Sequence, residues 1–291
     1  MKLGQILLVI VLSVAATLVT TRIADNSPQQ NEGIKQPVVK QTRLEQVKNS
    51  GVLRCGYFIW PPFNTKDPNT GKMSGLYYDL VEEIGQQLDI KIEWAGEVST
   101  GQMLADLASN RYDMICSPLG LTPGRAREGD FTTPFLYTPV YLYVRKDDTR
   151  FDNNFERANQ PDITLAIMDG ELSGIAANEN FPSAKQTTIL QLLNSADLFM
   201  AVANKKADAV VQDPFSFETY DKNNPGILRP TGNTPLRMLA AGMPLPANEP
   251  ALKAMIDTTI NYLIDSGYVD KLFRKYEGNF KYFRAAKHYQ E

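Results

Sequence analysis

The sequence predicts an α/β protein made of two similar lobes, each a mostly parallel sheet flanked by helices. Between Val52 and Cys116 the patterns alternate as strand, helix, strand, helix, strand, which is typical of a parallel sheet. The segment from Leu107 to Cys116 resembles the one from Val202 to Val211, because each combines a helix end, a polar turn, an aspartate and a buried strand. The 291 residues, 43% of them hydrophobic, suit one large or two medium domains. The repeat favours two.

The first lobe opens with a short helical segment from Arg43, which ends at Gly51. Its predicted strands cover residues 52–57, 90–94 and 114–116. A helix is expected to start at Asp79, because Leu80, Ile84 and Leu88 recur at helical spacing after a good N-cap residue. A second helix covers residues 101–111. Right-handed crossovers then bring the carboxyl ends of all three strands to one edge of the sheet.

Arg125 follows the third of these strands in a loop rich in turn residues, including Pro118, Gly120 and Pro123. Open α/β sheets bind their ligands at this edge. A guanidinium group there can hold a carboxylate through two parallel charge-assisted hydrogen bonds. On these residues alone, a surface arginine in a polar loop is an equally good interpretation.

Trp60 follows the first strand in the segment IWPPF, whose two prolines forbid a helix and hold the chain extended. It is therefore expected at the same edge as Arg125. We favour a side chain that faces a ligand pocket over one that packs in the core of the lobe.

The second lobe is expected to open with a strand over residues 163–168, followed by a tight turn and a helix that begins near Leu172. The backbone N–H groups of Glu171 to Ser173 would favour an anion at that helix start. Asp213 follows the repeated strand at its carboxyl end, as Arg125 does in the first lobe. Asp213 is also placed to cap a helix that begins at Pro214, and both roles are compatible.

Arg125 and Asp213 together suit one kind of ligand. An α-amino acid carries a carboxylate and an ammonium group on one carbon, so its recognition needs a fixed cation and a fixed anion on either side of it. The sequence places one of each, one in each predicted lobe.

Two crossing segments, 138–142 and 239–243, are predicted to connect the lobes and to form a hinge. Closure of such a hinge excludes water and strengthens charge interactions in the site. Helices within residues 252–276, separated at Gly267, are expected to pack back on the first lobe.

The first 27 residues are predicted to be an export signal or an anchor. Lys2 precedes an uncharged apolar span from Leu3 to Thr21, and residues 14–16 offer a cleavage site. A cleaved signal peptide is favoured over an uncleaved membrane anchor. No cysteine occurs there, which excludes a lipoprotein anchor. Residues 28–42 are expected to be a flexible linker.

Composition excludes several other classes of function. Lysine and arginine number 30 against 33 acidic residues, without a basic cluster, so nucleic acid is not an expected partner. The phosphate-loop signature is absent, and so are histidines and cysteines at metal spacing. The single histidine, His288, is expected to be solvated in a charged tail. We therefore expect no cofactor, no metal and no catalytic histidine.

Several motifs resemble those of family 3 periplasmic solute-binding proteins, the amino-acid-binding components of ABC importers. The resemblance covers about residues 43–283 and rests on LRCGYFIWPPF at Leu53, GKMSGLYYDL at Gly71, LTPGRAREGDFTTPF at Leu121 and SGYVDKLFRKY at Ser266. It implies a periplasmic-binding-protein-like fold of type II with a two-crossing hinge. It also implies a monomer in the periplasm, an amino-acid ligand and an ABC permease as partner.

The resemblance also implies a set of ligand-binding residues. The motif T-x-x-R matches from Thr122 to Arg125, whose guanidinium binds the ligand carboxylate, and Asp213 matches the aspartate that binds the ammonium group. An aromatic residue at the place of Trp60 stacks over the ligand. The remaining expected ligand-binding residues are Phe58, Ser117, Gly120, Glu171, Leu172 and Ser173.

Three positions depart from the family pattern. Phe58 stands where some members carry an acid that binds a cationic side chain, and Gly120 replaces a serine. Glu171 stands where small hydroxyl residues are common. Phe58 and Trp60 favour a ligand whose side chain is uncharged. Glu171 is compatible with a ligand whose side chain is polar.

The two cysteines, Cys55 and Cys116, fall in strands that the family's sheet places side by side. Export permits a disulfide. We expect reduced cysteines, because neighbouring parallel strands rarely offer the geometry of a bridge.

The predicted boundaries are 43–140 and 240–291 for the first lobe and 141–239 for the second. Capture of an amino acid for import is the leading function. An enzyme related to cyclohexadienyl dehydratases, with Glu171 or Asp213 as proton donor or acceptor, is one alternative. A membrane-tethered ligand sensor is another, if residues 3–21 stay uncleaved.

Overall fold

The computed structural model describes residues 41–60, 63–152, 154–190, 195–276 and 284–286. The predictions for the apolar span 3–21, for most of the linker and for His288 lie outside these residues. The chain from Thr42 onward forms one compact unit that contains both lobes.

Lobe 1 is built on a parallel three-stranded sheet in the order β4-β1-β5. Cys55 in the central strand pairs with Trp94 on one side and with Met114 on the other. The helices α3, α9 and α10 share one buried cluster with this sheet. The strands are β1 (Val52–Tyr57), β4 (Lys91–Glu97) and β5 (Met114–Ile115), and the helices are α2 (Arg43–Ser50), α3 (Leu76–Leu88), α4 (Met103–Ala108), α9 (Pro250–Asp265) and α10 (Tyr268–Lys275).

Short strand pairs complete lobe 1. They join β2 (Thr65–Lys66) to β3 (Met73–Ser74) and β7 (Asp130–Phe131) to β14 (Pro244–Leu245), both antiparallel. Gly51 ends α2 in the left-handed conformation, with φ of 66°, as the sequence predicts.

Lobe 2 has a mixed sheet. Three parallel strands stand in the order β10-β9-β11, and β11 continues onto β8, which runs antiparallel to it. The strands are β8 (Leu136–Arg145), β9 (Thr164–Ile167), β10 (Lys185–Thr188), β11 (Ala209–Gln212) and β12 (Leu228–Pro230), and the helices are η1 (Phe155–Asn159), α6 (Leu172–Asn180), α7 (Ala196–Ala203) and α8 (Pro214–Asn223).

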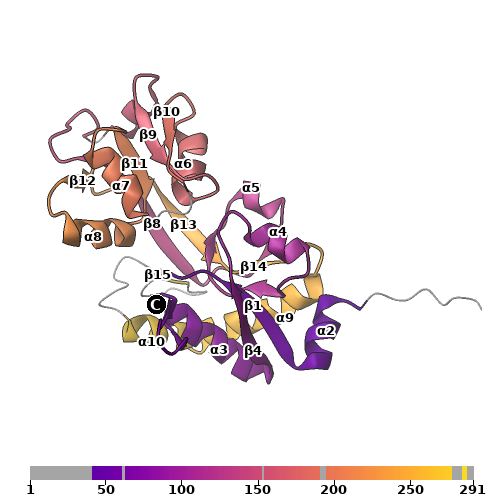
Figure 1. Ribbon diagram of the computed structural model, residues 1–291. Coiled ribbons are helices and arrows are strands. Elements are labelled where there is room, and N and C mark those ends of the chain that lie inside the picture. The colour runs from indigo at the N-terminus through magenta and orange to yellow at the C-terminus, as the bar shows by residue number, and fades with distance from the viewer. Residues whose placement is uncertain (1–40, 61–62, 153, 191–194, 277–283, 287–291) are drawn as a thin grey trace, which may run out of the picture. The chain divides into compact units, whose positions relative to one another are not determined.

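Two strands run between the lobes and lie side by side (Figure 1). The first half of β8 pairs with β13 (Arg237–Gly242), with Leu239 opposite Thr138, while its second half pairs with β11 in lobe 2. The short strand β15 (Arg284–Ala285) also pairs with β8. The predicted two-crossing connection is therefore confirmed.

The repeat seen in the sequence is also a repeat in structure. The Asp113 amide donates to Arg54 O at 2.8 Å, and the Asp113 carboxylate accepts from Arg54 N at 2.8 Å. Asp208 makes the same two bonds with Thr164, at 2.7 and 2.9 Å. In each lobe this aspartate ties the start of one strand to its parallel neighbour.

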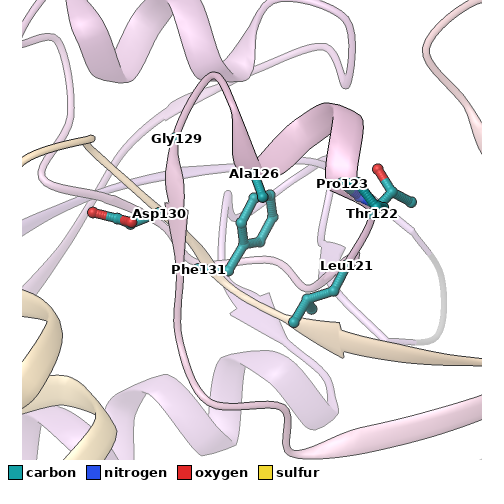
Figure 2. Close-up of a pocket in the computed structure, with 7 residues that line it drawn as sticks. All are labelled: Leu121, Thr122, Pro123, Ala126, Gly129, Asp130 and Phe131. Carbon is teal, nitrogen blue, oxygen red and sulfur yellow. The ribbon is translucent and has the colours of Figure 1, made fainter.

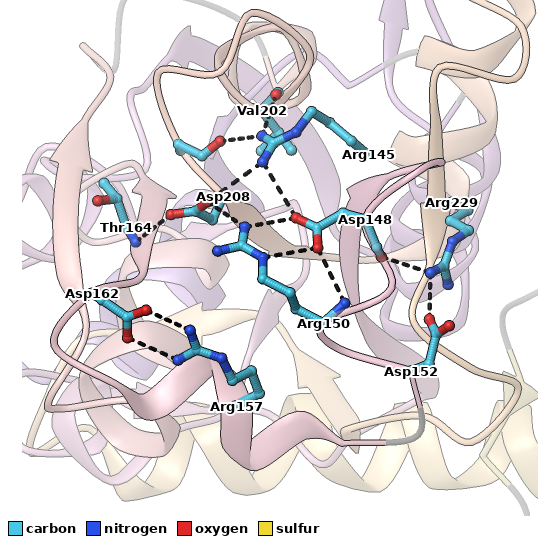
Figure 3. A network of polar contacts seen from close by, with 11 residues as sticks. Arg145, Asp148, Arg150, Asp152, Arg157, Asp162, Thr164, Val202, Asp208 and Arg229 are labelled. Atoms are coloured by element: carbon cyan, nitrogen blue, oxygen red, sulfur yellow. Dashed lines mark hydrogen bonds and ion pairs between the residues drawn. The ribbon is translucent and has the colours of Figure 1, made fainter.

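Arginines surround both of these aspartates. In lobe 2 the Asp208 carboxylate lies between the guanidinium groups of Arg145 and Arg150 (Figure 3). In lobe 1 the Asp113 carboxylate accepts from the buried Arg43 at 2.7 Å and from Arg54 at 2.7 Å.

The predicted start of the first long helix was wrong. Helix α3 begins at Leu76, with Gly75 as its N-cap at φ of 124°, a conformation open to glycine alone. Leu76 and Tyr77 are buried in the helix's first turn. Asp79 therefore lies inside the helix, where its carboxylate accepts from Lys275 and from the Tyr276 hydroxyl.

The expectation of reduced cysteines was also wrong, because Cys55 and Cys116 form a disulfide. Strand β5 ends at Ile115, and the amide of the next residue, Cys116, still donates to Gly56 O at 2.8 Å. Its Cα atom comes within 5.4 Å of the Cα atom of Cys55, a distance that suits a bridge.

Candidate ligand site between the lobes

Arg125 lies in a segment with regular secondary structure, where the sequence predicts a loop rich in turn residues. Between β5 and Arg125 the chain forms a short strand, β6 (Leu119–Gly120), and then the one-turn helix α5 (Pro123–Ala126). Thr122 caps that turn, since its hydroxyl accepts from the Arg125 amide at 3.3 Å. Thr122 thus positions the backbone of Arg125.

The Arg125 guanidinium reaches from lobe 1 to lobe 2. One terminal nitrogen donates to Gly120 O at 2.9 Å, and the other donates to Gly170 O at 2.6 Å, next to the start of α6. Burial lowers the pKa of Arg125, and the nearby Glu171 carboxylate opposes this shift. Among the described residues Arg125 has no ion-pair partner, so its charge is balanced by carbonyl dipoles and, at longer range, by the carboxylates of Glu171 and Glu179.

Gly120 has a packing role as well. A Cβ atom at this position would lie 2.4 Å from a methyl carbon of Leu239 on β13. Leu239 therefore fills the space that a serine side chain would need. Glycine in place of the family's serine therefore allows β13 to pack close to the backbone at this position.

Asp213 lies at the other contact between the lobes. It directly follows β11 and is the N-cap of α8, so its predicted capping role is confirmed. One carboxylate oxygen accepts from the Ser216 amide at 2.9 Å and the other from the Ser216 hydroxyl at 2.7 Å.

The Asp213 carboxylate is buried, with 5% of the residue exposed. Burial raises its pKa, although the bonds from Ser216 act in the opposite direction. No cation forms an ion pair with Asp213 within the part of the chain that the structure describes. A buried carboxylate in this state gains from any cation that reaches it.

The start of α6 carries the other predicted lobe 2 residues. Helix α6 begins at Leu172, as predicted, and Glu171 is its N-cap residue. The Glu171 side chain accepts a hydrogen bond from the Thr100 hydroxyl of lobe 1. The Ser173 hydroxyl accepts from Met168 N at 2.9 Å and so closes the turn before the helix. Leu172 packs against a buried cluster of lobe 2.

Trp60 belongs to an aromatic cluster that joins the lobes. Its ring lies 4.5 Å from that of Phe63 and 6.3 Å from that of Tyr77, and it is partly buried. Phe215, from the first turn of α8, places its ring edge-on to Phe63 at 4.6 Å and to Trp60 at 6.4 Å. Trp60 thus packs on the core of lobe 1 and also faces lobe 2.

Phe58 and Ser117 have different surroundings from Trp60. Phe58 packs against a separate buried cluster that includes Leu119 and Phe131. The Ser117 hydroxyl is fully buried and accepts from Phe58 N at 3.2 Å and from the Asn64 amide at 2.7 Å. Ser117 therefore holds the segments after β1 and β5 together.

Sequence reasoning missed Asn64, Phe63, Tyr77 and Phe215. Tyr77 stands at helical spacing from Leu80 and Ile84, which marks it as a core residue. Phe215 follows a proline at a helix start, and this gives no sign of a contact with Phe63. The one available signal was the density of aromatic residues in IWPPF and GLYYDL.

A separate hollow of about 330 Å³ lies beside α5 (Figure 2). Its lining residues are Leu121, Thr122, Pro123, Ala126, Gly129, Asp130 and Phe131. This lining contains a carboxylate and no basic side chain. It does not offer the pair of opposite charges that a zwitterion needs.

Within the described residues, no cluster of histidine, cysteine, aspartate and glutamate has the arrangement of a metal site. Over the same residues, no helix combines the length and the apolar character that a membrane crossing requires.

The two lobes and their two connecting strands define the type II periplasmic-binding-protein fold. The match to the model of the bacterial extracellular solute-binding proteins, family 3, extends over residues 53–279, and the chain belongs to that family. The predicted resemblance is thereby confirmed. Members of this family are extracytoplasmic.

Similar proteins include both binding proteins and an enzyme. The chain is 24% identical over 234 residues to cyclohexadienyl dehydratase of Pseudomonas aeruginosa, which covers 78% of this chain and 83% of the relative. It is 26% identical over 215 residues to the glutamine-binding protein of Geobacillus stearothermophilus, covering 70% of this chain and 79% of the relative.

A solved structure of an ancestral amino acid-binding protein, described as a precursor of cyclohexadienyl dehydratase, matches with a TM-score of 0.66 and 26% identity. The match covers 81% of this chain and 99% of the ancestral protein. The cysteine-binding protein of Campylobacter jejuni has the same fold, with a TM-score of 0.65 over 81% of this chain and 92% of its own.

Proposed function

We propose that the protein captures an α-amino acid between its lobes, outside the cytoplasm, and delivers it to an ABC permease. One observation carries this proposal: Arg125 on lobe 1 and Asp213 on lobe 2 both lie where the lobes meet, and neither has an ion-pair partner among the described residues. A zwitterion supplies both missing partners in one molecule.

The two charges act on different ends of the ligand. The Arg125 guanidinium exchanges its carbonyl contacts for a carboxylate, which it holds through two parallel bonds. The Asp213 carboxylate receives the ammonium group and regains the stabilisation lost by burial. Both steps draw the lobes together, since each charge belongs to a different lobe.

The ligand side chain is uncharged in this proposal. Phe58 supplies no charge that could pair with a cationic side chain, and the cluster of Trp60, Phe63 and Phe215 lines the meeting point of the lobes with aromatic rings. Binding proteins for glutamine and cystine stand among the relatives. These names support an amino-acid ligand for this chain.

A thermal unfolding screen against the twenty L-amino acids and L-cystine tests the proposal. A bound amino acid at about a hundred times its dissociation constant adds roughly 2.7 kcal/mol of stability. Arg125→Ala should abolish that shift. Arg127→Ala, an exposed neighbour at the end of the same short helix, should retain it. No shift with any member of the panel, or an equal shift in Arg125→Ala, contradicts the proposal.

A dehydratase activity is the second candidate, because the relatives include cyclohexadienyl dehydratase. At the site itself, the raised pKa of buried Asp213 suits a proton donor. Incubation of the purified protein with prephenate and with arogenate decides between the candidates. Turnover that is lost in Asp213→Asn supports the enzyme, and unchanged substrate supports capture alone.

We place the protein in the periplasm, after removal of a signal peptide, as a monomer. A membrane-tethered sensor is the alternative for an uncleaved N-terminal span. The mass of the mature protein from its natural host separates the two, because cleavage removes the apolar segment and tethering retains it.

A further inference from the structure

Tyr77 carries a buried hydroxyl group for which the described residues provide no partner. Only 1% of this residue is exposed, and its hydroxyl oxygen makes no hydrogen bond. The ring is held firmly: it stacks on Phe63 at 5.4 Å with an interplanar angle of 14°, and it meets Phe135 edge-on at 6.2 Å. Its amide also donates to Phe63 O at 3.1 Å. The hydroxyl is therefore fixed in place with an unused acceptor and an unused donor.

Asn64 offers a second unused acceptor in the same part of lobe 1. The residue is fully buried and adjoins Phe63 in the chain. Its amide nitrogen donates to the Ser117 hydroxyl at 2.7 Å, and its side-chain oxygen has no partner among the described residues. Buried polar groups of this kind are rare in folded proteins and call for an explanation.

Asp213 lies on the facing side of the same aromatic cluster. Phe215, two residues after Asp213, packs on the Phe63 ring on which Tyr77 stacks. Burial and, second, the negative charge of Asp213 raise the pKa of Tyr77. The electrostatic effect agrees with the ring contacts, which place both Tyr77 and the start of α8 against the ring of Phe63.

We propose that the Tyr77 hydroxyl and the Asn64 side-chain oxygen are the lobe 1 acceptors for the ligand ammonium group that Asp213 neutralises. This inference rests on the proposed function. An ammonium group has three N–H donors, and the Asp213 oxygens already accept from Ser216. Two neutral acceptors beside one carboxylate complete its shell without adding a charge. The surrounding ring faces favour a cation as well.

Tyr77→Phe tests the inference, because it removes the hydroxyl and keeps the packed ring. Tyr220→Phe is a matched control: Tyr220 is 2% exposed, stacks on Phe199 in lobe 2 and also has an unpartnered hydroxyl. Calorimetric titration would use the best binder from the panel of L-amino acids and L-cystine. A second titration would use the same acid without its α-amino group.

For the amino acid, we expect Tyr77→Phe to bind roughly ten- to hundredfold more weakly than the wild type, the loss of a bond to a charged group. Tyr220→Phe should bind as the wild type does. For the acid without the amino group, Tyr77→Phe and wild type should bind equally, because the lost contact is absent from both complexes.

The titrations distinguish a failure of this inference from a failure of the proposed function. If the wild type binds an amino acid and Tyr77→Phe binds it equally well, the inference fails and the proposed function stands. If Tyr77→Phe weakens both probes alike, the hydroxyl serves another part of the site, and the inference again fails. If the wild type binds no member of the panel, the proposed function fails and the inference fails with it.

Discussion

At the scale of single residues, Asp213 has two opposing effects on the stability of the folded protein. Its carboxylate caps α8 through Ser216, yet it is buried without a cation among the described residues. Burial favours the neutral form of the carboxyl group and raises its pKa. The charged form therefore lowers the stability of the folded protein. The burial of this charge costs free energy in the folded protein, and in the proposed function the ligand's ammonium group offsets that cost.

Asp213→Asn should therefore stabilise the ligand-free protein or leave it unchanged, while it abolishes amino-acid binding. Asparagine caps helices about as well as aspartate and retains an acceptor for Ser216. Urea unfolding and calorimetric titration would measure the two effects. A clear loss of stability, or binding like that of the wild type, would show that the carboxylate is not held for a cation.

The pH dependence follows from the same shift. The folded-state pKa of Asp213 lies above the unfolded-state value of about 3.9. The loss of folding stability caused by the buried charge is therefore absent below about pH 3.9 and complete above the folded-state pKa. Affinity for an amino acid should fall as the pH drops through the folded-state pKa, and Asp213→Asn should remove this dependence. Titrations between about pH 4 and 7 would test it, and a flat profile in the wild type would contradict it.

The placement of Arg125 and Asp213 after a buried strand was predictable from the sequence, because each strand is recognisable by its own apolar pattern, and strand ends share one edge. The surroundings of these charges were not predictable. Tyr77 meets Phe63 once α3 packs in lobe 1, and Phe63 meets Phe215 only after both lobes have formed. No local pattern encodes a contact between residues so far apart in the chain.

At the scale of elements, paired aspartates fix the strands of both lobes. Asp113 binds the backbone of Arg54 at the start of β1 and accepts from the Arg43 side chain at the start of α2. Burial acts to raise the pKa of Asp113, but the bonds from Arg54 and Arg43 outweigh it and lower the pKa. This contribution to stability is complete above about pH 4 and is lost as the pH falls through the lowered pKa.

Asp113→Asn should cost about 3–5 kcal/mol, because it leaves the buried Arg43 guanidinium without its carboxylate. Asp106→Asn is the control: its partner Arg111 is 62% exposed, so the loss should be about 0–1 kcal/mol. Urea unfolding at neutral pH compares the two. Equal losses would contradict the role given to Asp113.

The disulfide adds a second tie within lobe 1. It closes a loop with a sequence separation of 61 between Cys55 and Cys116. Replacement of both cysteines by serine should cost about 2–5 kcal/mol. Thermal unfolding of this variant and of the wild type with and without reductant would measure the loss. An unchanged midpoint in both comparisons would mean that the bridge does not stabilise the fold.

The sheet order of lobe 1 followed from its alternating pattern, while the bridge did not. The strand pattern ran to Cys116, whereas the regular pairing ends at Ile115. Cys116 lies two residues beyond the pairing of Cys55 with Met114, yet its Cα atom is 5.4 Å from that of Cys55, and no sequence pattern shows this distance. The start of α3 was missed for a similar reason, because a glycine conformation at Gly75 outweighed a good cap at Asp79.

At the scale of the whole molecule, hydrogen bonds and ring contacts between described residues join lobe 1 to lobe 2 besides the connecting strands. They include the bond from Arg125 to Gly170, the bond from Thr100 to Glu171, and the ring contacts of Phe63 and Trp60 with Phe215. Each of the proposed ligand charges lies beside one of these contacts. In the proposed function, binding and the relative position of the lobes are therefore coupled through the same residues.

A crystal structure of the protein with its best-binding amino acid tests this account most directly. The account predicts the ligand carboxylate within about 2.9 Å of the Arg125 guanidinium nitrogens, and the ammonium group at a similar distance from the Asp213 carboxylate. A ligand bound elsewhere, or bound with either of these side chains turned away from it, would contradict the account.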